Sequence, residues 1–217
     1  MAGKKIGLIR VLTTDDSDLL QAHGAIIEKN IPELKVESRC IPDQPTGVHS
    51  EETHRKAVPK ILELAKEMEK EGLQGIIISC AGDPGLEESR AVLKIPVLGA
   101  GKTLALTALI CGDKVGVLSL SGETPVNMKN ILGDALVAEE SAGAENAVEL
   151  MEAGKMERVL ASCQRLKNSG AEVIVPACTG MSTIGAAQKI IDELNIKVID
   201  PVVSEGIAMW SILKFYT

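Results

Sequence analysis

Aromatic side chains are almost absent from this chain of 217 residues, which holds one tryptophan, one phenylalanine and one tyrosine. All three lie at the C-terminal end, as Trp210, Phe215 and Tyr216. Base stacking and cation-binding cages both depend on aromatic rings. Neither is therefore expected elsewhere in the chain, and the core is predicted to be aliphatic.

Clusters of basic residues are also missing, and the formal net charge is −7. Lysines and arginines between Lys66 and Lys94 are diluted by acidic neighbours, whereas a nucleic-acid-binding face needs them grouped. No hydrophobic run is long enough to span a bilayer, and Ile6–Leu12 is too short for a secretory signal. We therefore expect a cytoplasmic protein with neither nucleic acid nor membrane as a partner.

The cysteines lack the spacing of metal ligands, since no Cys-x-x-Cys occurs. The five of them stand at positions 40, 80, 111, 163 and 178. An odd number without a framework pattern favours reduced thiols and predicts no metal site.

Apolar, β-branched segments alternate with helical ones throughout the chain, which is typical of parallel βα units. The clearest helix is expected over Glu51–Glu71, where apolar residues recur at helical spacing until Gly72 ends it. Strands are expected near residues 5–12, 34–40, 75–80, 96–99, 114–120, 136–140, 173–178 and 197–200.

The pattern also repeats. Lys5-Ile6-Gly7-Leu8-Ile9 matches Lys114-Val115-Gly116-Val117-Leu118, and Cys80 and Cys178 follow equivalent apolar runs 98 positions apart. The predicted fold is α/β, with two pseudo-symmetric Rossmann-like halves, mainly parallel sheets and an active-site cleft between them. The first half is expected to contain residues 1–100 plus 205–217, and the second residues 101–204.

Cys80 and Cys178 are each followed by a glycine-bearing turn, with Ala81-Gly82 after the first and Thr179-Gly180 after the second. Backbone N–H groups at such a turn favour a thiolate. Two opposed thiols can remove a proton from one face of a carbon and return one to the other face. This is the chemistry of a cofactor-independent racemase or epimerase.

Two alternatives compete with this interpretation. Free cysteine is often simply a small buried hydrophobe, and this is the preferred interpretation of Cys40, Cys111 and Cys163. A disulfide between Cys80 and Cys178 would need Cα atoms within about 7 Å, which two thiols flanking a substrate carbon should not satisfy.

Other residues are candidates for substrate binding. Arg10 at the end of the first strand could hold a carboxylate, or could pair with Asp15 or Asp16 at the surface. Ser121 and Thr124 follow the corresponding strand of the repeat and could bind substrate oxygens, or serve as ordinary turn and cap residues.

Two further motifs do not indicate a catalytic or phosphate-binding site. Asp83 before Pro84 is expected to cap the next helix. Gly101-Lys102-Thr103 follows a strand, but Pro96 occupies the place where a phosphate-binding loop needs glycine. No histidine pairs visibly with either cysteine, so Cys–His hydrolase chemistry has little support.

Three stretches resemble the aspartate, glutamate and hydantoin racemase superfamily, and hydantoin racemases most of all. They are Cys80-Ala81-Gly82-Asp83-Pro84-Gly85-Leu86, Ala177-Cys178-Thr179-Gly180-Met181 and Val198-Ile199-Asp200-Pro201-Val202. The resemblance implies two α/β halves around a cleft, no cofactor, and Cys80 and Cys178 as paired acid and base. Where hydantoin racemases often carry Asn-Pro-Asn after the first strand, this chain has Arg10-Val11-Leu12-Thr13-Thr14.

The expected function is racemisation or epimerisation at a carbon α to a carbonyl, in a hydantoin or amino-acid-like small molecule. Backbone N–H groups of Ala81, Gly82, Thr179 and Gly180 would stabilise the enolate. A cis–trans isomerase or decarboxylase on the same scaffold is one alternative, and a two-lobed binding protein without turnover is another. A homo-oligomer is expected on general grounds.

Overall fold

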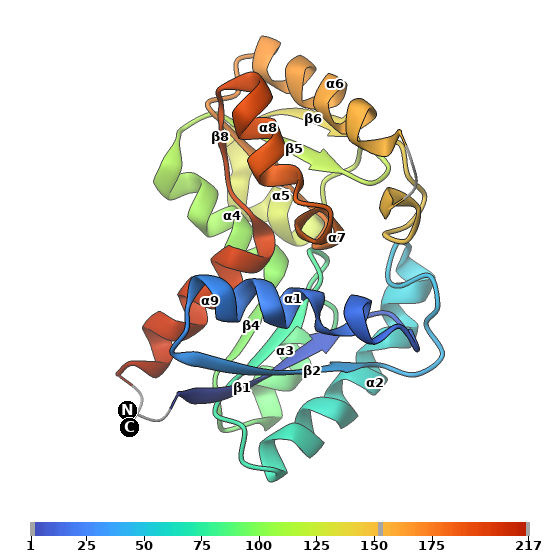
Figure 1. Ribbon diagram of the computed structural model, residues 1–217, viewed down its shortest axis with the longest axis vertical. Coiled ribbons are helices and arrows are strands. Elements are labelled where there is room, and N and C mark those ends of the chain that lie inside the picture. Colours follow the sequence, from blue (N-terminus) through green and yellow to red (C-terminus); the bar gives the residue numbers. More distant parts are fainter. Residues whose placement is uncertain (1–2, 152–153, 216–217) are drawn as a thin grey trace.

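The computed structural model describes residues 3–151 and 154–215, which form two sheets of identical strand order. The first sheet has the order β2-β1-β3-β4 and the second β6-β5-β7-β8, with parallel pairing throughout (Figure 1). The strands are β1 (Lys4–Arg10), β2 (Leu34–Cys40), β3 (Ile76–Ser79), β4 (Val97–Gly99), β5 (Val115–Ser119), β6 (Leu136–Ser141), β7 (Val173–Pro176) and β8 (Lys197–Val198). The predicted α/β fold of two repeated halves is confirmed.

Helices cover the faces of both sheets, as expected when crossover connections join parallel strands. They are α1 (Ser17–Asn30), α2 (Glu51–Lys70), α3 (Leu86–Val92), α4 (Ala100–Cys111), α5 (Val126–Leu132), α6 (Lys155–Asn168), α7 (Gly180–Thr183), α8 (Ala186–Leu194) and α9 (Pro201–Leu213). Short 3₁₀ turns span Gly133–Ala135 and Glu149–Met151. Helix α2 begins at the predicted residue, Glu51, and ends at Lys70, close to the predicted end. A Ser50–Thr53 capping box precedes its first turn, and Gly72, with φ of 90°, follows its end.

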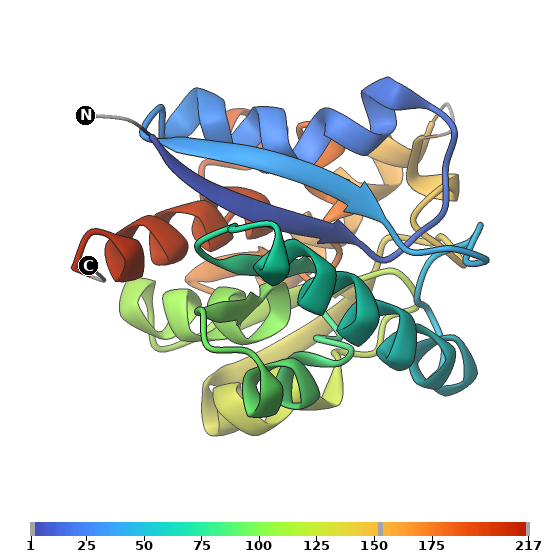
Figure 2. The ribbon, with the colours of Figure 1, turned by 90° about the horizontal axis from the view of Figure 1, so that it is seen from below.

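The chain passes between the halves twice, through α4 and through α9. Helix α4 leads from β4 into β5, and α9 returns from the second half to pack on the first (Figures 1 and 2). Val202, Met209 and Leu213 of α9 are buried with Ile6 and Ile77 of the first sheet. The exact domain boundaries stay a prediction, and Tyr216 lies outside the described residues.

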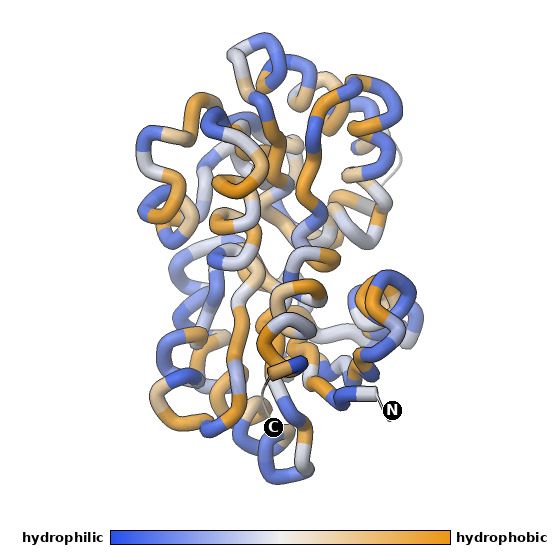
Figure 3. The backbone as a smooth tube through the Cα atoms, turned by 90° about the vertical axis from the view of Figure 1, so that its left-hand side faces the viewer, coloured by the Kyte–Doolittle hydropathy of each residue, from blue (hydrophilic) through white to orange (hydrophobic). Residues whose placement is uncertain are grey.

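The core is aliphatic, as the shortage of aromatic residues requires. Ile6, Leu8, Ile76 and Ile77 of the first sheet and Val175 of the second are fully buried. Hydrophobic stretches run through the interior of both halves in Figure 3, whereas the outer helical turns alternate in polarity. No helix within the described ranges is both long and apolar enough to cross a membrane.

Several strands are shorter than predicted, and the difference matters for the site. β3 stops at Ser79 and β7 at Pro176, so both candidate cysteines lie just beyond the sheets. The backbone N–H of Cys80 turns back onto the carbonyl of Ile78, at 2.9 Å, instead of continuing the ladder. Both cysteines therefore belong to the connections that follow their strands.

Candidate functional site

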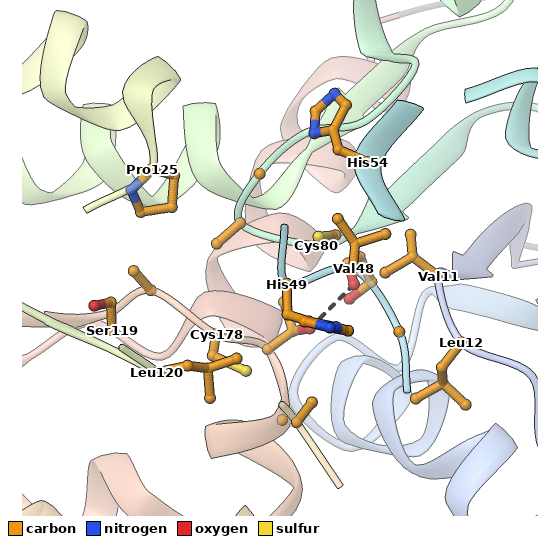
Figure 4. A pocket seen from close by; sticks show the side chains of 18 of the residues that line it. Val11, Leu12, Val48, His49, His54, Cys80, Ser119, Leu120, Pro125 and Cys178 are labelled. Atoms are coloured by element: carbon orange, nitrogen blue, oxygen red, sulfur yellow. Dashed lines mark hydrogen bonds between the residues drawn. The ribbon is translucent and has the colours of Figure 1, made fainter. Parts of the chain in front are cut away.

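A cavity of about 680 Å³ lies between the two halves, within the size range of small-molecule sites. Cys80 reaches it from the turn after β3, and Cys178 from the turn after β7. Figure 4 shows their sulfur atoms entering the same cavity from different sides. Both residues are 8% exposed, and all five cysteines are free, so no disulfide joins the two.

The structure brings every candidate residue from the sequence to this one cavity. Besides the two cysteines, the lining includes Arg10, Ala81, Gly82, Ser121, Thr124, Thr179 and Gly180. Ser121 is exposed at the rim, whereas Thr124 is buried and its hydroxyl has no hydrogen-bond partner among the described residues. Their proximity follows from the topology, because carboxyl ends of parallel strands meet at one edge of each sheet.

The two thiols differ in their surroundings. Burial raises the pKa of Cys80 to about 12 and that of Cys178 to about 11. The backbone N–H of Gly82 favours a thiolate at Cys80, whereas two N–H groups, from Gly180 and Met181, do so at Cys178. The turn after β7 thus offers its thiol more backbone donors than the turn after β3 does.

The turn that carries Cys80 is held by Asp83. Its carboxylate accepts hydrogen bonds from the backbone N–H groups of Gly101 and Lys102, at 2.8 and 2.7 Å. It also accepts one at 2.7 Å from the side chain of Asn127, whose amide donates to the Ala81 carbonyl as well. The expectation that Asp83 caps the helix after Pro84 was wrong, because Gly85 occupies the N-cap of α3 and Asp83 binds the start of α4.

This arrangement also explains why Gly101-Lys102-Thr103 is not a phosphate loop. The backbone N–H groups that a phosphate would need already bind the Asp83 carboxylate. Burial raises the pKa of Asp83 to about 6, although its three hydrogen bonds favour the ionised form.

Arg10 lies deeper in the site than its strand-end position suggested. The residue is 3% exposed, and its guanidinium donates to the carbonyls of Leu19 and Leu20 in α1. No carboxylate forms an ion pair with it among the described residues, so the surface pairing with Asp15 or Asp16 is absent. Its positive charge is buried at the cavity wall.

A chain of buried polar groups runs behind the two thiols. The hydroxyl of Ser79, adjacent to Cys80, donates to Glu205 Oε2 at 3.1 Å and lies 3.0 Å from His23 Nδ1. His23 Nε2 lies 3.0 Å from the hydroxyl of Thr183 in α7. The Thr179 hydroxyl donates to the Ser79 carbonyl at 3.0 Å. These hydrogen bonds thus connect the end of the strand that precedes Cys80 to the segment that follows Cys178.

The sequence alone did not indicate this series of hydrogen-bonded groups. Glu205 is fully buried in α9, and His23 is 1% exposed in α1. Burial raises the pKa of Glu205 well above its ordinary range and lowers that of His23 well below its own, so both favour their neutral forms. An available signal was a glutamate inside the apolar run Pro201–Leu213, where an isolated charge is out of place.

Glu205→Gln is expected to change how stability depends on pH. In the folded protein, Glu205 keeps its proton at pH values at which the unfolded chain has already released it. The contribution of this residue to the free energy of unfolding is therefore lost as the pH rises through the raised pKa. Because glutamine does not titrate, the wild type should lose stability relative to Glu205→Gln as the pH rises from about 5 to 8. Urea unfolding of both proteins across this range measures the difference, in which the common titration of His23 largely cancels. A difference that stays constant or grows in favour of the wild type would contradict the assignment.

Backbone N–H groups accompany both thiols. Each thiol is within a turn that offers backbone donors, and those of Ala81 and Thr179 have no other acceptor in the described structure. Such N–H groups can stabilise an oxyanion that develops beside the reacting carbon. The described residues contain no group of three histidine, cysteine or carboxylate side chains suited to a metal ion.

Comparison with protein families matches residues 6–204 to the Asp/Glu/Hydantoin racemase model. A hydantoin racemase of Pseudomonas sp. (strain NS671) is 28% identical over 175 residues. That alignment covers 74% of this chain and 66% of the relative, so the aligned part spans just under two thirds of that enzyme.

Comparison with solved structures shows the same fold. Allantoin racemase from Klebsiella pneumoniae superposes with a TM-score of 0.88 at 22% identity, covering 99% of this chain and 89% of that one. A variant of arylmalonate decarboxylase superposes with a TM-score of 0.72 at 15% identity, covering 99% and 94%. At these identities the likeness establishes the fold, and the chemistry must come from the site.

Proposed function

Because the chain belongs to the Asp/Glu/hydantoin racemase family, we propose that it is a cofactor-independent racemase in which Cys80 and Cys178 act as paired acid and base. The observation that carries this proposal is that Cys80 and Cys178, one from each half, line the same cavity. Two-sided proton transfer requires such an arrangement, because each face of the carbon needs its own group.

In the proposed reaction, one thiolate takes the α-proton, and the C–H electron pair moves into the adjacent carbonyl to form an enolate. The backbone N–H groups of Ala81 and Thr179, helped by Gly82 and Gly180, stabilise the enolate oxygen. The opposite thiol then gives its proton to the other face of the carbon. One sulfur gains a proton as the other loses one, so the step balances without a cofactor.

The cavity favours a neutral cyclic substrate of the hydantoin type over a free amino acid. A free carboxylate is best held by two N–H groups of an accessible arginine, whereas Arg10 is 3% exposed and its Nη1 already donates to two carbonyls of α1. Val11, Leu12 and Val48 add an apolar wall (Figure 4). A hydantoin ring also carries a carbonyl beside its reacting carbon, which the mechanism requires.

Decarboxylation on the same scaffold is the main alternative, since arylmalonate decarboxylase shares the fold. It needs only one proton donor after loss of carbon dioxide, whereas this chain places two thiols in the cavity. Carbon dioxide release from an arylmalonate without exchange of any hydantoin α-proton would favour that alternative. A binding protein without turnover would bind its ligand and exchange no α-proton, so deuterium exchange distinguishes it from the racemase. The cytoplasmic location and the homo-oligomeric state stay predictions.

Incubation with single-enantiomer hydantoins in D₂O tests the proposal. The protein should introduce solvent deuterium at the α-carbon while optical rotation falls to zero, and it should act far more slowly on free aspartate or glutamate. Proton NMR and polarimetry follow the two events in one sample. Heat-denatured protein controls for the spontaneous exchange of hydantoins. If no hydantoin exchanges faster than in that control, the proposed function fails.

A further inference from the structure

The imidazole of His23 lies where the two halves meet, and the proposed reaction gives it no chemical role. The residue belongs to α1 of the first half, is 1% exposed and is not among the residues that line the cavity. Helix α7 of the second half faces this part of α1 (Figure 1). A buried polar ring is stable only when its polar atoms have hydrogen-bond partners, and each nitrogen of His23 has one.

The two partners of His23 lie next to the two thiols. Nδ1 is 3.0 Å from the hydroxyl of Ser79, the residue that precedes Cys80. Nε2 is 3.0 Å from the hydroxyl of Thr183, which ends the short helix directly after the Cys178 turn. A neutral imidazole has one donor and one acceptor, and a hydroxyl can act as either, so both contacts can be hydrogen bonds. We term this series, Ser79–His23–Thr183, the His23 bridge.

Both ends of the His23 bridge are fixed within their own half. Ser79 is the last residue of β3, and its hydroxyl also donates to Glu205 in α9. In the second half, the backbone N–H of Met181 in α7 donates to the Cys178 carbonyl at 3.1 Å, so α7 is joined to the turn that carries this thiol. The imidazole therefore links two segments that each hold one of the cysteines in place.

We propose that His23 is a positioning residue, which joins the two halves and sets the separation of the Cys80 and Cys178 sulfur atoms. This inference rests on the proposed two-thiol reaction and names a residue that holds its geometry. Inversion depends on the separation, because the reacting carbon must lie within reach of both thiols at once. Removal and return of a proton by one thiol depends on it far less. Loss of the His23 bridge should therefore impair inversion more than exchange with retention of configuration.

His23→Leu tests the bridge, because leucine fills a similar volume and makes no side-chain hydrogen bond. In D₂O, the ratio of deuterium exchange with retention to inversion should rise about tenfold in this variant. This is less than the about 100-fold cost of a 1 Å displacement, because the hydrogen bond from Thr179 to Ser79 still joins the halves. Chiral chromatography with mass spectrometry measures both products, on the hydantoin enantiomer that the wild type racemises fastest. An equal fall of both rates, as a merely structural role predicts, would overturn the inference.

A second pair of variants tests the other end of the bridge. Thr183→Val removes the hydroxyl that contacts Nε2 while keeping a similar shape, and it should raise the same ratio. Thr183→Ser keeps a hydroxyl and should return the ratio to the wild-type value. Gln21→Leu, on the exposed face of α1, is the matched control for the His23 substitution and should leave both rates unchanged. If His23→Leu does not fold, as judged by circular dichroism, the two Thr183 variants decide the question, and equal ratios in them would overturn the inference.

Cross-linking reports the separation of the two sulfur atoms without any substrate. Each terminal carbon of 1,3-dichloroacetone forms an S–C bond with a thiolate as chloride leaves, so one molecule can join two neighbouring thiols. Peptide mass mapping compares Cys80 joined to Cys178 with the singly alkylated cysteines. The joined fraction should fall about fivefold in His23→Leu and stay unchanged in Gln21→Leu. A joined fraction in His23→Leu equal to that of the wild type would overturn the inference.

The two measurements separate this inference from the proposed function. If cross-linking falls in His23→Leu but the wild type racemises no hydantoin, His23 keeps its positioning role and the proposed function fails. If the wild type racemises hydantoins while His23→Leu changes neither cross-linking nor the ratio of exchange to inversion, the proposed function is retained and the inference about His23 fails.

Discussion

Serine in place of either Cys80 or Cys178 is expected to lower the racemisation rate by about 1,000-fold or more, the contribution typical of a positioned acid or base. A serine hydroxyl is too weak an acid to replace a thiol at either side. Because the lost group serves only one face of the carbon, inversion stops even though the other thiol remains. Initial rates of optical rotation with each hydantoin enantiomer measure the loss.

In these variants, deuterium exchange at the α-carbon should continue although inversion of its configuration stops. The remaining thiol is still able to remove and return a proton on its own face, so one enantiomer should gain deuterium from D₂O while keeping its handedness. The favoured enantiomer should be opposite in Cys80→Ser and Cys178→Ser. Cys111→Ser is the matched control, because Cys111 ends α4 and does not line the cavity. Full racemisation by either single variant would show that one thiol suffices.

Gly101→Ala is expected to destabilise the protein by about 3 kcal/mol, at the upper end of the cost of overpacking. A Cβ at this position would lie 1.9 Å from the Ala81 carbonyl oxygen and 2.5 Å from Asn127 Nδ2. One of these is backbone, so the turn that carries Cys80 must shift. Elsewhere in a helix, replacement of glycine by alanine gains about 1 kcal/mol, so the sign of the change is diagnostic.

Urea unfolding and hydantoin racemisation should both report the Gly101 substitution, since the displaced Ala81 is adjacent to Cys80. Lys102→Ala provides the matched control at the next position. Its backbone N–H still binds Asp83, and its side chain makes only an exposed contact with Glu87 at 3.5 Å. That variant should stay within about 0.5 kcal/mol of the wild type. If Gly101→Ala proves as stable as Lys102→Ala, the tight approach of α4 to the Cys80 turn is not present in solution.

The eight strands and their duplication were predictable because local patterns encode them. β-branched runs such as Ile76–Ile78 and Val173–Val175 favour buried parallel strands, and the repeat of one half in the other implies equal topology. The same repeat predicted that Cys80 and Cys178 lie at corresponding strand ends. It overestimated strand length, because where pairing stops depends on hydrogen bonds such as that from Cys80 N–H to Ile78.

The partners of Asp83, His23 and Glu205 were not predictable in this way. Asp83 binds the start of α4 and Asn127 of α5, and His23 meets Ser79 and Thr183 from distant parts of the chain. Such contacts depend on how whole elements pack, and no local spacing encodes them. A glutamate in an apolar helix signals a buried polar contact without naming its partner.

The sequence by itself determined a duplicated α/β chain with an aliphatic core and one thiol in a glycine-bearing turn in each half. These follow from side-chain chemistry and short-range periodicity. Only the tertiary structure decided that the two thiols share a cavity, that Asp83 holds the Cys80 turn, and that Arg10 is buried with no carboxylate partner among the described residues. The physical reason is that these contacts join groups remote in the chain, and the packing of whole elements sets the distances between such groups.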